Sequence, residues 1–260
     1  MLHYRFLFEQ LVRRELRARY KGSALGLLWY LVNPLLLMAV YGLIFGVFIK
    51  SATTSEHDYL LFLFVGLIVW LFFSQALLAA ATALTEQASL VSRVRFPRLA
   101  IPASVVTVQM ITFCALLLLV LPVAAGVRGI LGAPLLLLVP LVACLYAFVL
   151  GVCLVASILH AYFRDVHPIL SALLLPWFFL TPIYFVPEKA PGVAGSSVAR
   201  TFLEWVNPIA PFIRALRAVV YGGVWPSAGE LAYVAIAAVL ALAAGQALFR
   251  RLEGELAVVL

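Results

Sequence analysis

Charged residues are scarce in this chain, and their scarcity excludes a soluble globular protein. They make up 11% of the 260 residues, whereas hydrophobic residues make up 65%, and the mean hydropathy is +1.12. A soluble domain typically carries about 25% charged residues. Ten-residue segments of alternating polarity, which mark an outer-membrane barrel, are also missing. The composition therefore predicts an all-α integral membrane protein.

The charges that are present avoid the interior of every long apolar stretch. Six stretches approach the roughly 20 residues needed to cross about 30 Å of hydrocarbon. Glu230 stands at the start of the last stretch, and no Asp, Glu, Lys or Arg lies deeper in any of them. Ion-coupled transporters and intramembrane enzymes usually place titratable groups at that depth, so the pattern argues against both classes. The predicted spans are 24–49, 60–83, 103–126, 134–159, 169–186 and 229–249.

Lysine is rare as well, and no phosphate-binding loop is present. Lys21, Lys50 and Lys189 are the only lysines, and none stands in a G-x-x-x-x-G-K-[ST] frame. An ATP-driven machine would therefore need ATP and Mg²⁺ on a separate chain, and we expect no cofactor or metal on this one. The three cysteines fall in apolar runs and are expected to be small core residues without a disulfide.

The uneven distribution of Arg and Lys predicts the orientation. With both termini in the cytoplasm, twelve of the 18 basic residues face the cytoplasm and six face the other side. Cytoplasmic loops carry such an excess, so the net charge of +7 needs no nucleic-acid partner. The twelve are Arg5, Arg13, Arg14, Arg17, Arg19, Lys21, Arg93, Arg95, Arg98, Arg164, Arg250 and Arg251; the six are Lys50, Arg128, Lys189, Arg200, Arg214 and Arg217.

The first 23 residues predict an amphipathic helix on the cytoplasmic membrane surface. Tyr4, Phe8 and Leu11 recur on one face, and basic residues recur on another. The apolar run begins only after this charged segment and has no small-residue cleavage site before it, so no signal peptide is expected. The basic residues assigned to this interfacial helix are Arg13, Arg14, Arg17, Arg19 and Lys21.

The long segment before the last predicted span is apolar but broken. Asn207-Pro208 and Pro211 interrupt it, and the stretch after them is too short to cross a membrane. Pro211 suits a first helical turn, and Gly222-Gly223 suits a helix end. We expect a re-entrant or interfacial helix pair at 200–224, buried in protein.

Two predicted cytoplasmic loops carry polar residues that suit a protein contact. The first extends from Glu86 to Pro102 and contains Arg93, Arg95 and Arg98 with Phe96 between them. Such a loop is either an ordinary basic anchor or a contact for an acidic cleft on a partner. The second contains Arg164-Asp165. His160 and Asp165 share the H-x-x-x-x-D spacing of acyltransferases, but this spacing is short and common and no phosphate-binding glycines accompany it, so an ordinary polar loop explains it better.

Aromatic side chains are concentrated in the first, second and fifth predicted spans. They could form membrane belts and pack the bundle. They could also line a pathway for sugars, whose apolar C–H faces stack on aromatic rings. Gly22 and Gly26, and likewise Gly42 and Gly46, have the G-x-x-x-G spacing that permits close helix approach. The candidate lining residues are Trp29, Tyr30, Tyr41, Trp70, Phe73, Trp177, Phe178 and Tyr184.

Four motifs carry a resemblance to a known family. The basic run from Arg19 to Trp29, followed by Asn33-Pro34, closely resembles the opening of ABC type-2 permeases that export polysaccharides, among them the O-antigen and teichoic-acid exporters. Arg95-Phe96-Pro97-Arg98 resembles the loop by which these permeases dock on their ATPase, and Tyr162-x-Arg164-Asp165 resembles a second loop facing it. The run from Asn207 to Arg217 resembles the element at their outer mouth.

The resemblance implies a bacterial cytoplasmic (inner) membrane protein whose transmembrane domain covers 24–260. A second copy of the chain, two ATP-binding subunits, membrane lipid and a lipid-linked polysaccharide would be its partners. The expected coupling residues are Glu86, Arg93, Arg95, Phe96, Pro97, Arg98, Arg164 and Asp165, and the expected outer gate is Asn207, Pro208, Pro211 and Arg217. A type-2 ABC exporter of a drug or another lipid, and a membrane acyl- or glycosyltransferase, are the alternatives.

Overall fold

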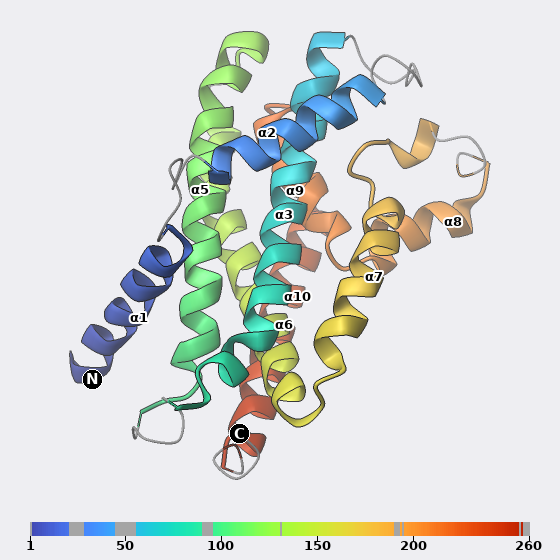
Figure 1. Cartoon of the computed structure of the whole chain (residues 1–260). Coiled ribbons are helices and arrows are strands. Elements are labelled where there is room, and N and C mark those ends of the chain that lie inside the picture. The colour runs from blue at the N-terminus through green and yellow to red at the C-terminus, as the bar shows by residue number, and fades with distance from the viewer. Residues whose placement is uncertain are drawn as a thin grey trace.

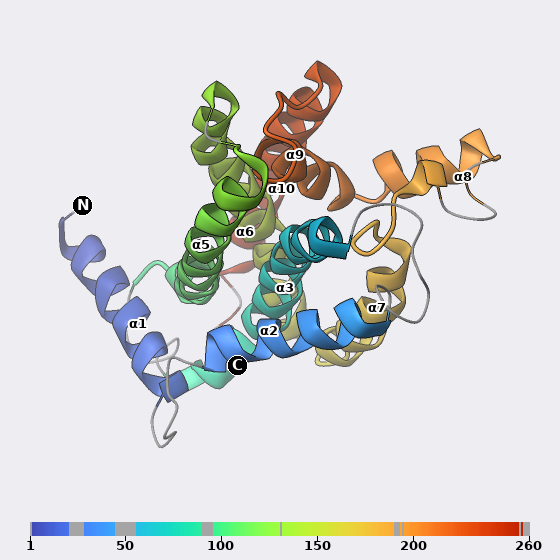
Figure 2. The ribbon, with the colours of Figure 1, turned by 90° about the horizontal axis from the view of Figure 1, so that it is seen from above.

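The chain folds around one buried helix, α3 (Glu56–Glu86). The computed structural model describes residues 2–20, 29–44, 56–89, 96–130, 132–189, 193, 195–254 and 256, and every regular element in these ranges is a helix. Side chains from Leu61 to Trp70 are all buried, so α3 is apolar on every face, as a central helix must be. Figures 1 and 2 show α5, α6, α7 and α9 around it.

Three further long helices complete the bundle; the first two pack directly on α3, and the third packs on the second of them. They are α5 (Ala100–Arg128), α6 (Leu138–Tyr162, preceded by the 3₁₀ turn η3, Ala133–Leu137) and α10 (Ala228–Leu252). Buried residues make up 83% of the most apolar window of α3, but 28% in α5 and α6 and 17% in α10. The outer three thus leave apolar faces uncovered by the chain, as helices facing lipid do.

Helices α6 and α10 approach each other until their backbones touch. A Cβ atom on Gly151 would lie 2.5 Å from the backbone nitrogen of Leu242, and closer still to the carbonyl group of Ala241. A Cβ atom on Gly245 would lie 2.9 Å from the Cα of Gly151. Glycine on both sides therefore sets the separation of these two helices.

Four of the six predicted spans are confirmed as helices long and apolar enough to cross a membrane. They are Tyr59–Glu86, Ala100–Arg128, Ala133–Tyr162 and Ala228–Leu252. The first predicted span, 24–49, is described only between 29 and 44. There α2 (Trp29–Tyr41) continues as a π-type turn to Ile44 and lies obliquely across the upper end of the bundle (Figure 1). This described part is too short to cross.

The helix in the fifth predicted span, 169–186, ends at Leu180, before the predicted end. Helix α7 covers Val166–Leu180 and stops at Thr181, which adopts an extended backbone. Pro182 explains the stop, because a residue before proline is driven out of the helical region. Residues 181–186 form a turn, and a short 3₁₀ helix, η4 (Pro187–Lys189), follows.

The predicted helical pair at 200–224 is present as two helical pieces with a break at Asn207-Pro208. The first piece is α8 (Ser197–Thr201), which continues as the π-type turn η5 (Phe202–Val206). The second is α9 (Ala210–Val220), with Pro211 in its first turn. Gly223 has φ 61° and follows the end of α9, and the Gly222 N–H bonds the carbonyl of Arg217 at 2.9 Å. The predicted start and stop signals are thus confirmed.

The loops divide the bundle into two ends. Residues 96–99, 163–165 and 253–254 meet at the lower end in Figure 1, and residues 129–130 and 221–227 meet at the upper end. The N-terminal helix α1 (Leu2–Tyr20) slants beside the lower half of α5 and contacts it. The predicted N-terminal helix is confirmed, and its Leu11 is buried against the bundle.

Candidate functional sites at the two ends of the bundle

Two side chains at the lower end hold the end of α10. Arg98, just before α5, donates from Nη1 to the carbonyl of Glu253. Tyr162, the last residue of α6, donates its hydroxyl to the carbonyl of Leu252 at 2.8 Å. The last carbonyls of a helix have no donor within it. Residues beside both predicted coupling loops therefore satisfy acceptors at the end of one helix.

The predicted coupling residues occupy two kinds of position. Glu86, Pro97, Arg164 and Asp165 are exposed at the lower end, where a partner could contact them. Phe96 is half-buried and packs against the apolar core, so it supports the loop from inside. Arg93 and Arg95 lie outside the described residues.

His160 and Asp165 do not form a reactive pair. His160 is buried, and its Nδ1 accepts a hydrogen bond from the backbone N–H of His167 at 3.3 Å. Asp165 is exposed in the turn between α6 and α7. Within the described ranges, no group of three or more His, Cys, Asp or Glu side chains could hold a metal ion.

The basic face of α1 is open to the surroundings. Arg13, Arg14 and Arg17 are exposed, and Arg13 pairs with Glu9 at 2.6 Å, one turn before it. Such an exposed pair contributes only a few tenths of a kcal/mol. The side chain of Arg19 and all of Lys21 lie outside the described part.

The predicted lining aromatics cluster where α2, α3 and α7 meet. Tyr41 stacks on Phe178 with ring centroids 5.3 Å apart, and Trp177 meets Phe73 edge-on at 5.2 Å. Trp70 lies 6.1 Å from Trp177. Such ring pairs are worth about 0.5–1.5 kcal/mol beyond the area they bury. Packing is therefore shown for these rings, and lining of a sugar pathway stays a prediction.

Burial separates the packing rings from the exposed ones. Trp70, Phe73 and Phe178 are buried within the chain and serve as core. Tyr41, Trp177 and Tyr184 are half-buried, and these partly exposed rings remain candidates for a pathway lining. The side chains of Trp29 and Tyr30 lie outside the described part.

Arg217 is the most fully engaged of the predicted outer-gate residues. It is buried on α9 and donates to the carbonyls of Phe62, at 3.1 Å, of Pro182, at 2.6 Å, and of Ile183. Its guanidinium lies 3.6 Å from the ring centroid of Phe62. Gly66 leaves room for this group. Arg217 thereby binds α9 to α3 and to the turn that follows α7.

Asn207 reinforces the same turn from the other end of α9. Its side-chain amide donates to the hydroxyl of Thr181 at 2.9 Å and accepts from the indole N–H of Trp177 at 3.1 Å. The backbone N–H of Ile209 also donates to it, at 3.3 Å. The break at Asn207-Pro208 and the stop of α7 at Thr181 are therefore one structural unit.

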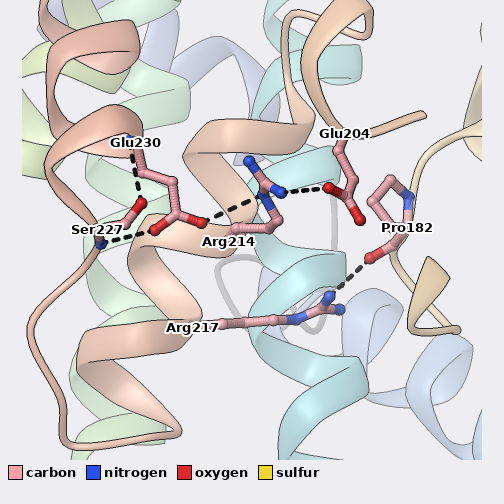
Figure 3. A network of polar contacts seen from close by, with 6 residues as sticks. All are labelled: Pro182, Glu204, Arg214, Arg217, Ser227 and Glu230. Atoms are coloured by element: carbon pink, nitrogen blue, oxygen red, sulfur yellow. Dashed lines mark hydrogen bonds and ion pairs between the residues drawn. The ribbon is translucent and has the colours of Figure 1, made fainter. Parts of the chain in front are cut away.

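A second arginine on α9, one turn before Arg217, connects α9 to η5 and α10 (Figure 3). Arg214 lies 2.9 Å from Glu204 and 3.3 Å from Glu230. Glu230 also accepts from the backbone N–H of Ser227, whose hydroxyl accepts from the N–H of Glu230, which makes a capping box at the start of α10. One charged chain of contacts thus joins three helical elements.

Burial shifts the pKa values of two side chains that make these upper-end contacts. It raises the pKa of Glu204 above its usual range, while the positive charge of Arg214 opposes the shift. It lowers the pKa of Arg217 to about 9, with Tyr59 and Tyr221 opposing, so the guanidinium stays charged at neutral pH.

The sequence-based prediction did not anticipate the contacts among Glu204, Arg214 and Glu230. Ser227-x-x-Glu230 at the start of an apolar run has the spacing of a capping box, which was a readable signal for Glu230. No spacing rule links Glu204 with Glu230, because they lie on separate elements.

Comparison with known proteins decides the family. The sequence model of the ABC-2 type transporter family matches residues 7–221. The chain belongs to this family. It is 32% identical over 262 aligned residues to the O-antigen export system permease protein RfbA of Myxococcus xanthus, and the match covers 99% of this chain and 96% of that protein. A Klebsiella pneumoniae protein with the same name is 27% identical over 230 residues, which cover 84% and 82% of the two chains.

Membership of the ABC-2 type transporter family agrees with the apolar helices of the structure. The chain is a membrane transport subunit, and four of its described helices are long and apolar enough to cross a membrane. The family match includes the coupling-loop residues, the aromatic cluster and α9. It ends at Tyr221, before α10, whereas the similarity to the Myxococcus protein covers α10 as well.

Proposed function

We propose that this chain is the permease subunit of an ATP-driven exporter that moves a lipid-linked polysaccharide of the O-antigen type across the bacterial inner membrane. The observation that carries the proposal is the similarity over nearly the whole length to a protein named an O-antigen export system permease. Two shorter matches bear the same name. The chemistry of the chain fits, because aromatic rings suit sugar faces and the apolar segments lack charged interiors.

Two copies of the chain would enclose the pathway. The half-buried rings of Tyr41, Trp177 and Tyr184, with Trp29 and Tyr30, would line it, and Trp70, Phe73 and Phe178 would support them from behind. Rings without charged groups hold sugars weakly, and weak binding lets a long polymer slide. At the outer mouth, Asn207, Pro208, Pro211 and Arg217 would hold the gate element in place.

The complete membrane domain would have six spans. The segments containing α2 and α7 would be the first and fifth, and 200–224 would be a re-entrant pair on the outer side. Both apolar helices are short, since Pro34–Ile44 and Val166–Leu180 each fall below a crossing length. A re-entrant pair requires its polar groups to be satisfied inside protein, which fits the contacts of Arg217 and Asn207.

Two ATP-binding subunits would bind the lower end. Glu86, Pro97, Arg164 and Asp165 would form the exposed contact, together with Arg93 and Arg95 and with Phe96 and Arg98 bracing the loop. The basic face of α1 would lie on the lipid headgroups beside them. ATP and Mg²⁺ would bind only to those subunits, and closure of their dimer would move the lower end.

The first prediction concerns ATP. The purified chain alone should hydrolyse no ATP, whereas the chain co-purified with its ATP-binding subunit should hydrolyse ATP and restore surface O-antigen to a strain lacking its own permease. Phosphate release and surface polysaccharide are the measurements. Sustained hydrolysis by the chain alone, or complementation that persists with a hydrolysis-deficient partner, would contradict the proposal.

The second prediction concerns orientation. Ser197 at the start of α8 and Asp165 at the lower end are both exposed, and basic-residue asymmetry places them on opposite sides of the membrane. A membrane-impermeant maleimide should label Ser197→Cys in intact spheroplasts, and Asp165→Cys only after permeabilisation. The unsubstituted chain is the control, because its cysteines lie within α5 and α6. The opposite pattern of labelling would reverse the orientation.

A further inference from the structure

The lower end of α10 accepts one hydrogen bond from a predicted coupling loop and another from the residue just before the second predicted coupling loop. Arg98 comes from the loop before α5, and Tyr162 directly precedes the loop of Arg164 and Asp165. The end of a helix carries partial negative charge, which favours a cation such as Arg98 there. Phe249 and Leu256 are fully buried on either side of this point. Residues of, or next to, both loops are therefore hydrogen-bonded to the same end of α10.

The middle of α10 cannot slide freely along the bundle. At the Gly151–Gly245 crossing the two backbones are in contact, so α6 and α10 shift together. Packed interfaces of this kind move between discrete arrangements and do not deform continuously.

The upper end of α10 is fastened to the outer mouth. Glu230, in the first turn of α10, pairs with Arg214 of α9, and Arg214 pairs with Glu204 of η5 (Figure 3). A helix of 25 residues is about 37 Å long, so α10 joins the two ends directly.

We propose that α10 is a connecting rod, which carries movement of the two lower loops to the α9 gate element, and that Tyr162 and Arg98 are the positioning residues that attach it. This inference rests on the proposed ATP-driven export. The rod lies beyond the residues matched by the family model, so it is argued from this chain's own contacts.

Tyr162→Phe and Glu230→Gln test the two attachments separately. Phenylalanine removes only the hydroxyl that binds Leu252. Glutamine preserves a capping box but removes the charge that pairs with Arg214. The matched controls are Tyr146→Phe, which removes a hydroxyl bonded to Thr107 inside the bundle, and Glu188→Gln on exposed η4.

The measurement is the amount of polymer exported per ATP hydrolysed by the whole complex. Surface O-antigen gives the export and phosphate release gives the hydrolysis. The amounts of the chain and of the ATP-binding subunit in the membrane report assembly. Each attachment variant should lower this ratio about three- to tenfold, the effect of losing one hydrogen bond or ion pair, at unchanged assembly. The controls should stay at the wild-type ratio. The double variant should be no worse than the poorer single variant, because the two attachments act in series on one movement, and movement lost at one end cannot be lost again at the other.

Three results would overturn the rod. One is an unchanged ratio in both attachment variants. Another is a parallel fall of assembly, hydrolysis and export, which would mean a structural role only. The third is a double variant whose loss equals the product of the single losses, as distant independent sites give. A wild-type complex that hydrolyses no ATP or exports nothing would instead remove the proposed function, and the rod with it.

Discussion

Gly151→Ala is expected to destabilise the chain by about 1–3 kcal/mol or more, because the added methyl group has no room. The atoms it would meet are backbone atoms of Ala241 and Leu242, which cannot rotate aside as a side-chain tip can. Helices α6 and α10 would have to separate. Gly245→Ala should have a similar effect, since its methyl group would meet the backbone of Gly151. The measurement is thermal unfolding of the detergent-solubilised complex.

Gly126→Ala is the matched control. Gly126 also lies inside a long apolar helix, α5, but an added methyl group there would meet no neighbouring atom within 4 Å. Alanine there should be neutral or stabilise by about 1 kcal/mol through helix propensity alone. Equal midpoints for all three variants would show that the α6–α10 crossing is not a close backbone contact.

Arg217→Met is expected to cost about 3–5 kcal/mol. The carbonyls of Pro182 and Ile183 lie outside helices, and both residues are buried, so losing their donor leaves them unsatisfied. The methionine keeps much of the stem but provides no hydrogen-bond donor. Arg217→Lys should fall between the two, because an ammonium group cannot reproduce a planar fork that reaches three carbonyls. Thermal unfolding and surface O-antigen should decline in the order Arg, Lys, Met.

Arg128→Met is the control for this series. Like Arg217, Arg128 donates a hydrogen bond and lies over an aromatic ring, but it does so in an exposed position. It donates to the hydroxyl of Tyr221 at 2.5 Å and lies over the ring of the same residue. Exposed contacts of this kind are worth about 1 kcal/mol or less. A loss at Arg128 as large as the loss at Arg217 would show that burial of the Arg217 contacts is not what makes them strong.

Much of the fold was predictable because each long helix carries its own signal. The four confirmed spans are long, uninterrupted apolar runs, and Pro211 and Gly223 mark a helix start and stop by their backbone requirements alone. The difference at 169–186 arose where hydropathy and backbone chemistry disagree. Residues 181–186 are apolar, but Pro182 stops the helix, and Arg217 and Asn207 satisfy the polar groups that it releases.

The candidate sites were predictable in their residue types and less so in their contacts. Arg98 was expected to reach a partner subunit, and here it binds the end of α10. Trp70, Phe73 and Phe178 are of the residue type that would line a sugar pathway, but their side chains are buried in the core of the chain. The G-x-x-x-G spacing pointed to Gly22, Gly26, Gly42 and Gly46, of which only Gly42 lies in the described part of the chain, where a Cβ atom would lie 2.5 Å from the side chain of Leu60. The backbone contact between Gly151 and Gly245 has no such spacing to announce it.

The sequence by itself determined that this is a helical membrane protein of a transporter family with no phosphate-binding loop of its own, and it predicts that the basic loops lie on one side of the membrane. Those properties depend on composition and on short-range sequence patterns, which can be read without knowing how the chain packs. Tertiary structure alone decided that Arg217 binds α3 and the turn after α7, that Arg214 joins Glu204 to Glu230, and that Arg98 and Tyr162 meet at α10. Each of those contacts joins residues that are distant in sequence. Only packing of the whole chain brings such groups within hydrogen-bond distance, where burial makes their pairing strong.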